Sequence, residues 1–212
     1  GISFDLAKVM ARKDSVVSNL TRGIQGLFRK NKVELKTGTA RLLPDLQVEV
    51  TTSSGDTETL TAANIIVATG SVPVDIPVAR TNGMSIVDNS GALAFNDVPT
   101  RLGIIGAGVI GLELGSVWSR FGAEVVILEA MDDFLAAADR QVADQALKLL
   151  RKQGLDIRMG CKVSAAKTTG DSVTVRYESS DGEHALEVDK LIVAVGRRAC
   201  TDGLGTAEAG LE

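Results

Sequence analysis

Residues 101–130, which read RLGIIGAGVIGLELGSVWSRFGAEVVILEA, decide the fold class of this chain. The apolar run Leu102–Ile105 leads into the glycine-rich turn Gly106–Gly111, and apolar residues at helical spacing follow that turn. A second apolar run, Glu124–Leu128, ends at Glu129, which lies 18 positions after the last glycine of the turn. This order of strand, glycine turn, helix, strand and acid is typical of an α/β sheet that binds a dinucleotide.

Each glycine of the turn has a separate physical role in such a site. Gly106 permits the tight turn after the strand, and Gly108 lets the backbone approach a pyrophosphate closely. Gly111 allows the helix to pack against the strand. The pyrophosphate is expected at the helix N-terminus, where unpaired N–H groups and the helix dipole favour negative charge.

Glu129 predicts which dinucleotide binds. Its carboxylate can accept hydrogen bonds from both hydroxyls of the adenosine ribose. A 2′-phosphate at the same place would be repelled by a few kcal/mol, roughly the energy of two charges about 4 Å apart at an intermediate dielectric. The next residues, Ala130–Asp133, include no basic side chain. The sequence therefore favours NAD over NADP.

The composition excludes several other classes of protein. The chain has 212 residues, of which 44% are hydrophobic, and no apolar run approaches the roughly 18 residues that a membrane helix needs. A net charge of −4 does not favour nucleic acid as a partner. One histidine and two distant cysteines, Cys161 and Cys200, disfavour a metal site or a disulfide scaffold. We expect a soluble, cytoplasmic α/β protein without a membrane or nucleic-acid partner.

Hydrophobic periodicity and turn residues predict the remaining elements. A helix should begin after Asp5, and another should run from about Asp139 to Lys152 and end at Gly154. The expected strands besides the two above are Val33–Leu35, Gln47–Thr51, Thr59–Thr61, Asn64–Ala68, Leu155–Arg158, Lys162–Ala165, Ser172–Tyr177, His184–Val188 and Lys190–Val195.

Two apolar strands of the chain end alike. Residues 66–70 read IVATG and residues 192–196 read IVAVG, which suggests two related dinucleotide-handling units, the first of them incomplete. Pro73 and Pro77 follow the first strand closely and indicate a connector between domains.

Three stretches carry a resemblance to a known family. Gly106–Trp118 reads GAGVIGLELGSVW, residues 121–130 read FGAEVVILEA, and residues 190–198 read KLIVAVGRR. The chain resembles the bacterial dihydrolipoamide dehydrogenases, members of the class I pyridine nucleotide-disulfide oxidoreductases, along essentially its whole length. GLELGSVW is more specific than the glycine turn, because related disulfide reductases vary there.

The resemblance implies a flavoenzyme that oxidises protein-bound dihydrolipoyl groups and passes electrons through an enzyme disulfide and FAD to NAD. Its partners would be lipoyl domains of 2-oxoacid dehydrogenase complexes, and the parent enzyme would be a homodimer. Residues 1–72 would be a partial FAD-binding domain. Residues 73–198 would be a Rossmann-like NAD-binding domain with a parallel sheet, helices and a β-meander, and residues 199–212 would return to the FAD domain.

The resemblance also implies the residues that bind the cofactors. The FAD contacts would be Gly38, Thr69, Gly70 and Ser71. The NAD contacts would be Ile105, Gly106, Ala107, Gly108, Val109, Ile110, Gly111, Glu113, Glu129, Val163 and Gly196. Four of these residues have simpler explanations: Gly38 as an ordinary strand-end glycine, Thr69 and Gly70 as a common loop exit, and Glu113 as an acid that stabilises the helix dipole.

Several parts of the family pattern are missing from these residues. The 212 residues contain no second glycine fingerprint for FAD, no paired redox cysteines and no C-terminal domain with a catalytic histidine. Neither Cys161 nor Cys200 matches a redox position, and His184 lies in a polar stretch typical of a surface strand. We therefore expect a central fragment with no catalytic residue of its own, whose residues 1–72 expose apolar surface and whose NAD domain is the stable part.

Two other functions remain open at this point. The chain could belong to another FAD- and NAD(P)-dependent disulfide reductase or to a pyridine-nucleotide transhydrogenase, which a cysteine motif upstream would decide. It could also be a stand-alone nucleotide-binding module with no redox role.

Overall fold

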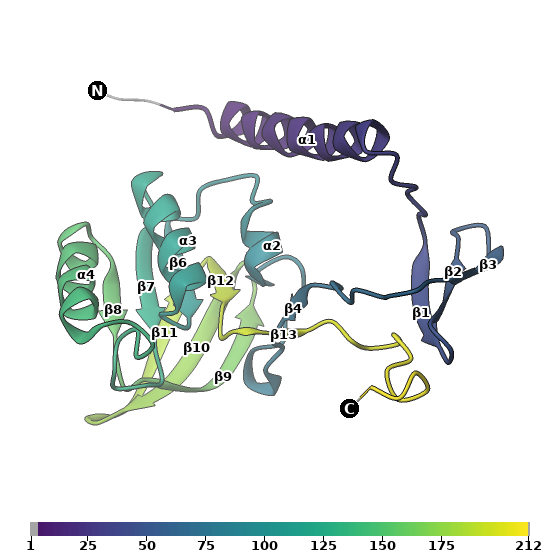
Figure 1. Cartoon of the computed structure of the whole chain (residues 1–212). Coiled ribbons are helices and arrows are strands. Elements are labelled where there is room, and N and C mark those ends of the chain that lie inside the picture. Colours follow the sequence, from purple (N-terminus) through teal and green to yellow (C-terminus); the bar gives the residue numbers. More distant parts are fainter. Residues whose placement is uncertain (1–3, 212) are drawn as a thin grey trace. The chain divides into compact units, whose positions relative to one another are not determined.

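A computed structural model describes residues 4–211 of the chain, which form two compact units (Figure 1). The larger unit contains the residues up to Met10 and Pro73–Arg198. The smaller unit contains Ala11–Val72 and the residues from Ala199 onward. Each unit is described by itself below.

A five-stranded parallel sheet forms the centre of the larger unit. Its strands, in spatial order, are β5 (Ile86–Val87), β12 (Lys190–Val193), β6 (Arg101–Ile105), β7 (Glu124–Leu128) and β8 (Asp156–Arg158). Strands β6, β7 and β12 are continuous apolar runs because both faces of a parallel sheet are buried. This sheet confirms the predicted α/β fold class.

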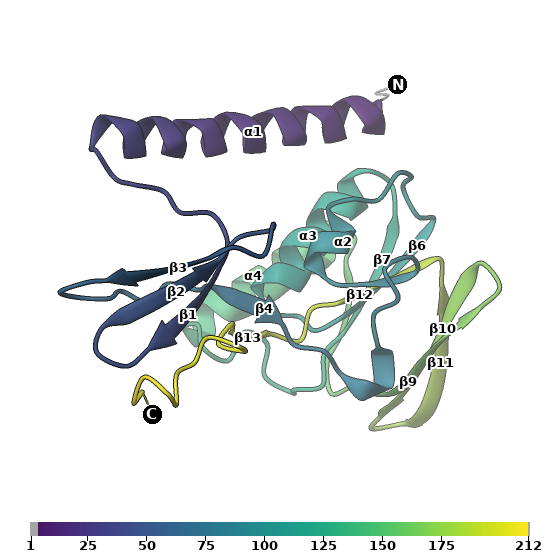
Figure 2. The ribbon, with the colours of Figure 1, turned by 90° about the vertical axis from the view of Figure 1, so that its right-hand side faces the viewer.

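Helices cover one face of this sheet (Figure 2). They are α2 (Asn89–Ala92), α3 (Val109–Arg120) and α4 (Arg140–Lys152). Trp118 of α3 is only 2% exposed and packs against Phe95 and Phe121, with ring centroids 5.1 and 5.7 Å away. The Asp139 carboxylate caps α4 by accepting hydrogen bonds from two backbone N–H groups of its first turn.

An antiparallel meander covers the other face of the sheet (Figure 2). It consists of β9 (Lys162–Thr169), β10 (Ser172–Ser179) and β11 (Gly182–Val188), with β10 in the middle. Alternate side chains of β10, those of Val173, Val175 and Tyr177, are buried against the sheet, as the two-residue period of a strand requires. The meander confirms that part of the predicted fold.

The single histidine of the chain, His184, lies on β11, close to the turn between β10 and β11. Nε2 of His184 lies 2.9 Å from Ser179 Oγ and 3.1 Å from Asp181 Oδ1. Because both neighbours contact the same ring nitrogen, the cluster cannot act as a serine–histidine–aspartate relay, which uses both nitrogens. Hydrogen bonds from Ser179 and His184 lower the pKa of Asp181.

This lowered pKa predicts a pH-dependent contribution to stability. An acid whose pKa falls on folding stabilises the fold above its unfolded pKa, and that contribution is lost as the pH falls through the folded value. Asp181→Asn should therefore lower the free energy of unfolding at pH 7 and have a smaller effect at about pH 2, which is well below the ordinary pKa of an aspartate. Urea unfolding at both pH values measures this, with Asp171→Asn in the neighbouring turn as the matched control. An equal deficit at both pH values would contradict the prediction.

Helix α1 (Leu6–Lys30) begins where the sequence predicted. The Asp5 carboxylate accepts a hydrogen bond from the backbone N–H of Lys8 at 3.2 Å, as a capping residue does. Leu6 and Met10 pack against the core of the larger unit, and the Phe4 ring stacks on Phe121 at 5.0 Å. Further along α1, apolar side chains at helical spacing are exposed, namely those of Val17, Leu20, Ile24 and Leu27.

The smaller unit contains an antiparallel sheet of β1 (Thr39–Leu43), β2 (Gln47–Thr51) and β3 (Thr57–Thr61). The expected strands at Gln47–Thr51 and Thr59–Thr61 are present, whereas β1 was not anticipated. The C-terminal segment contacts this sheet, because the Leu42 N–H donates to the Leu204 carbonyl at 2.7 Å.

Two expected strands are wrong. Val33–Leu35 and Asn64–Ala68 have no regular secondary structure and belong to no sheet within residues 4–211. The Ile66 side chain is 91% exposed. A strand is defined by hydrogen bonds to a neighbour, so an apolar run is not enough by itself. A third expected strand, Lys190–Val195, ends two residues earlier than predicted, at Val193.

In each unit, the two points at which the chain enters and leaves are joined by a hydrogen bond. In the larger unit the Val74 N–H donates to the Gly196 carbonyl at 3.0 Å. In the smaller unit the Cys200 N–H donates to the Gly70 carbonyl at 3.1 Å. These bonds flank the paired strands β4 (Ser71–Pro73) and β13 (Arg197–Ala199). No helix within residues 4–211 is long and apolar enough to cross a membrane.

Candidate dinucleotide site

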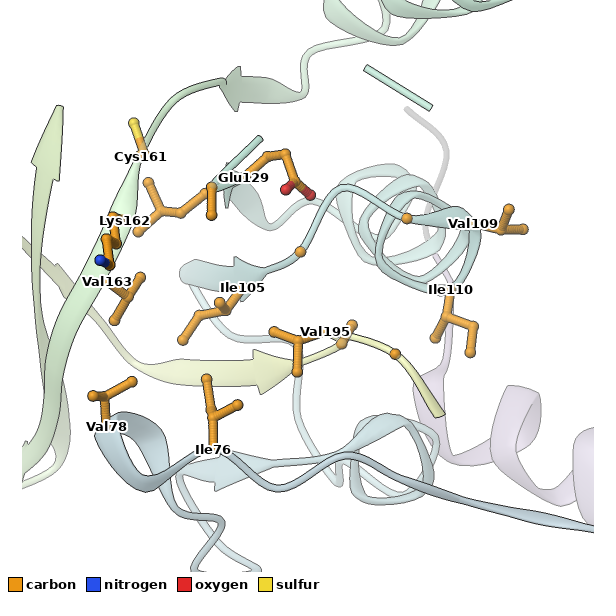
Figure 3. Close-up of a pocket in the computed structure, with 16 residues that line it drawn as sticks. Ile76, Val78, Ile105, Val109, Ile110, Glu129, Cys161, Lys162, Val163 and Val195 are labelled. Atoms are coloured by element: carbon orange, nitrogen blue, oxygen red, sulfur yellow. The ribbon is translucent and has the colours of Figure 1, made fainter. Parts of the chain in front are cut away.

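A groove of about 540 Å³ opens at the carboxyl ends of β6, β7 and β12 (Figure 3). Ligands of open α/β sheets bind at this edge. The residues that line the groove are Ile76, Val78, Ile105, Gly106, Gly108, Val109, Ile110, Leu128, Glu129, Ala130, Cys161, Lys162, Val163, Ala194, Val195 and Gly196.

Two glycines of the turn are required by packing, and the glycine between them faces open space. Gly106 has a φ of +102°, and a Cβ atom there would lie 2.5 Å from the Ala194 carbonyl oxygen. A Cβ atom on Gly111 would lie 2.1 Å from the Gly106 carbonyl oxygen. In contrast, a Cβ atom on Gly108 would meet nothing within 4 Å. The protein itself therefore requires glycine at the first and third positions, and the second faces the space in which a ligand would lie.

The N-terminus of α3 lies at this open position. Gly108 is its N-cap residue and provides no capping side chain. The first N–H groups of a helix have no partner within the helix. A turn that exposes them next to a glycine is suited to bind an anionic group such as a pyrophosphate.

Glu129 is fixed both through its side chain and through its backbone. Its Oε2 accepts a hydrogen bond from the Ala107 N–H at 2.7 Å, and its Oε1 accepts one from the Met131 N–H at 2.9 Å. Its own N–H donates to the Arg158 carbonyl at 2.9 Å, and its carbonyl accepts from the Cys161 N–H at 2.7 Å. The half-buried carboxylate is thus held beside the glycine turn and retains lone pairs for other donors.

The meander and a short helical turn complete the groove. Figure 3 shows Lys162 and Val163 at the start of β9, and Cys161 just before it, on the side away from Val109. Ile76 and Val78, at the 3₁₀ turn η1 (Pro77–Ala79), form another part of the lining. Burial raises the pKa of the Cys161 thiol, which keeps it protonated and unreactive at neutral pH.

The groove brings together eight of the residues that the sequence predicted for NAD, namely Ile105, Gly106, Gly108, Val109, Ile110, Glu129, Val163 and Gly196. Ala107 adjoins it through the bond to Glu129, and Gly111 packs behind the turn. Glu113 is exposed on α3 and is not part of the lining.

The four predicted FAD residues lie elsewhere. Gly38, Thr69, Gly70 and Ser71 belong to the smaller unit and do not line the groove. A Cβ atom on Gly38 would lie 2.4 Å from the Thr51 carbonyl oxygen, so packing within the β-sheet already accounts for that glycine.

Sequence reasoning missed half of the lining. Leu128, Ala130, Ala194 and Val195 adjoin predicted positions at strand ends, so the rule that ligands bind at the carboxyl ends of strands could have found them. No sequence signal identifies the other four, Ile76, Val78, Cys161 and Lys162, because tertiary packing alone brings them to the groove.

The chain was compared with models of known protein families. Residues 3–212 match the model of the pyridine nucleotide-disulphide oxidoreductases. The chain belongs to this family.

Several curated relatives within the family are similar over nearly the whole chain. Dihydrolipoyl dehydrogenase from Cupriavidus necator is 47% identical over 99% of the chain and 44% of that protein. Dihydrolipoyl dehydrogenase 3 from Pseudomonas putida is 42% identical over 99% of the chain and 46% of that protein. Leghemoglobin reductase from Vigna unguiculata is 40% identical over the full chain and 41% of that protein. The chain thus spans less than half the length of the relatives it matches.

Two solved structures share the fold of this chain. A variant of the flavoprotein disulfide reductase RclA from Escherichia coli, solved as a Cu(II) complex, matches with a TM-score of 0.87 and 29% identity. The match covers 99% of the chain and 47% of that protein. LpdA from Mycobacterium tuberculosis matches with a TM-score of 0.90 at 22% identity, which is a likeness of fold, over the full chain and 47% of that protein.

Proposed function

We propose that this chain contains the NAD site and part of the FAD-binding domain of a dihydrolipoyl dehydrogenase, which oxidises protein-bound dihydrolipoyl groups. In this proposal residues 73–198 are the NAD-binding domain, residues 1–72 belong to the FAD-binding domain, and residues 199–212 return to it. The supporting observation is the half-buried Glu129 carboxylate, held 2.7 Å from the backbone of the glycine turn at the edge of the groove.

The residues present fit NAD. The open space at Gly108 and the N–H groups of α3 would hold the pyrophosphate, because they combine close backbone approach with favourable polarity. The Glu129 carboxylate would accept hydrogen bonds from the ribose hydroxyls, and Val163 would contact the adenine. Gly196 would lie near the nicotinamide. Ala107 and Gly111 would shape the turn, and Glu113 would contact the nicotinamide end.

The contribution of this chain to the reaction is to bind and orient. Bound NAD supplies a hydride acceptor. The apolar side chains of Ile105, Ile110 and Val195 would exclude water from the nicotinamide end of the groove. The charged nicotinamide ring would therefore lie in surroundings of low dielectric constant. The dithiol chemistry is assigned to no residue of this chain, because 38 residues lie between Cys161 and Cys200 and Cys161 is buried.

The proposal extends to FAD and to partner proteins. Gly38, Thr69, Gly70 and Ser71 would contact FAD, a role supported by the family and not by the groove described above. The relatives are named dihydrolipoyl dehydrogenases, which supports dihydrolipoyl groups as the substrate. In this proposal the partners are lipoyl domains of 2-oxoacid dehydrogenase complexes, and the assembled enzyme is a homodimer.

The charge of Glu129 provides the test of this function. Wild-type protein should bind NAD at least about 100-fold more tightly than NADP, because a 2′-phosphate about 4 Å from a carboxylate is repelled by roughly 4 kcal/mol at an intermediate dielectric. Glu129→Gln retains an acceptor for the Ala107 N–H and removes the charge. This variant should bind NAD about tenfold more weakly and prefer it over NADP by less than about tenfold. Isothermal titration calorimetry with both nucleotides measures these affinities.

A matched control lies on the same strand. Glu124 is at the opposite end of β7, where its carboxylate is 3.6 Å from Nε of Arg101. Glu124→Gln should leave both affinities unchanged. Tighter binding of NADP than of NAD by the wild-type protein would overturn the role given to Glu129. A wild-type protein that binds neither NAD nor NADP would overturn the proposed function.

A further inference from the structure

Arg158 connects the parallel sheet to the meander through its side chain. It is the last residue of β8, and its Nη1 donates a hydrogen bond to the Tyr177 hydroxyl on β10 at 2.6 Å. Nε and Nη2 of the same guanidinium donate to Asp156 Oδ2 at 3.0 and 2.6 Å. The planar fork of arginine allows it to hold both partners at once.

The two ends of this link adjoin opposite parts of the groove lining. At one end, the Arg158 carbonyl accepts the hydrogen bond from the Glu129 N–H at 2.9 Å. At the other end, Tyr177 is the direct cross-strand partner of Val163 on β9. A β-bulge lies at this point, where the register shifts between Arg176 and Tyr177. The link therefore joins β8, whose Arg158 carbonyl binds the backbone of Glu129, to β10, which pairs with the strand that presents Val163.

The hydrogen bonds of this link are costly to break and do not depend on pH in the ordinary range. Tyr177 is only 5% exposed, and a buried hydroxyl without a partner costs about 1–3 kcal/mol. Arg158 is half-buried, and its hydrogen bond to Asp156 raises its pKa, so it remains charged at any ordinary pH. Arg158 itself does not line the groove.

We propose that Arg158 is a positioning residue for the adenosine half of the dinucleotide, acting through Tyr177 to hold the Val163 wall of the groove at a fixed separation from Glu129. This inference rests on the proposed NAD site. Loss of the link would let the two walls separate, which weakens contacts to the adenine and its ribose. Contacts to the nicotinamide end, near Gly196, would be unaffected.

A double-mutant cycle in the full-length protein tests this coupling. Arg158→Ala and Tyr177→Phe should each raise the Kd for NAD about tenfold, near the lower range for losing a hydrogen bond to a charged group. The double variant should bind no more weakly than the weaker single variant, because both substitutions remove the same link. Arg158→Lys, which can still donate to the tyrosine, should recover part of the affinity.

Two further measurements separate positioning from general destabilisation. The Kd for ADP-ribose should rise by the same factor as that for NAD, while the Kd for nicotinamide mononucleotide should stay within twofold of wild type. The binding stoichiometry should remain that of the wild-type protein. Arg176→Ala, on the exposed neighbour of Tyr177, is the matched control and should leave all three affinities unchanged.

Each outcome has a definite meaning. If wild-type protein binds neither NAD nor ADP-ribose, the proposed function fails. If wild type binds both and Arg158→Ala binds them equally well, or if the effects of the two substitutions add, the positioning role is wrong. Should Arg158→Ala fold poorly, Tyr177→Phe decides the question, because it removes one oxygen atom and retains the ring.

Discussion

A Gly111→Ala variant should lose NAD affinity by at least about 100-fold, equivalent to about 2.7 kcal/mol, and should also unfold more easily. The added methyl would lie 2.1 Å from the Gly106 carbonyl oxygen, which is a backbone atom and cannot rotate away. Gly106 is itself constrained, since a Cβ atom there would meet the Ala194 carbonyl at 2.5 Å. The helix must therefore move away from the turn, which disperses the N–H groups that would bind the pyrophosphate. Overpacking of this kind costs about 1–3 kcal/mol of stability.

The matched control for this variant is Gly108→Ala. Gly108 has an ordinary φ of −72° and open space where a Cβ atom would be. This variant should keep its free energy of unfolding within about 0.5 kcal/mol of wild type, and any loss of NAD affinity should come from the ligand's side alone. Calorimetric titration and urea unfolding measure the two effects. Wild-type NAD affinity in Gly111→Ala would show that the turn does not form the site.

The second large effect is expected at Trp118. This side chain is 2% exposed and lies between Phe95 and Phe121 in the core beneath α3. Trp118→Ala should lower the free energy of unfolding by about 3–5 kcal/mol, because it removes a large apolar side chain and leaves a cavity. Much of the stability of a typical domain would thereby be lost. Urea unfolding followed by circular dichroism measures the change.

Val117 provides the comparison for Trp118. It precedes Trp118 on the same helix, and its side chain is 42% exposed. Val117→Ala should change stability by less than about 0.5 kcal/mol, as surface substitutions usually do. A similar small effect for Trp118→Ala would mean that the aromatic cluster is not part of the stable core.

Local signals were sufficient to predict the parts of the fold that depend on short stretches of sequence. The strand, glycine turn and helix around Gly106 were predicted because each has a period or a special residue that physics requires. The same is true of the helices that begin after Asp5 and near Asp139, where the structure shows that a short polar side chain satisfies the first N–H groups.

The wrong predictions concern which segments pair as strands of a sheet, which no single stretch of sequence determines. Ile66 lies in a continuous apolar run, yet it is almost fully exposed because no described strand pairs with that run. Conversely, Thr39–Leu43 lacks clear alternation and becomes β1 through its partner Gln47–Thr51. The groove shows the same limit: Lys162 and Ile76 reach it only through the packing of the meander and of η1.

The hydrogen bond between Val74 and Gly196 bears on how the larger unit of this chain could be exchanged by protein engineering. The chain passes from the smaller unit into residues 73–198 and then back into the smaller unit, and the entry and exit points are close together. If residues 73–198 were removed, a short loop could join the two remaining ends at little entropic cost. Insertions are tolerated where the two ends lie close together. Together with the first turn of α1, whose Leu6 and Met10 pack on the same core, residues 73–198 are a compact unit of their own. A recombined gene could exchange this unit for the corresponding unit of a relative.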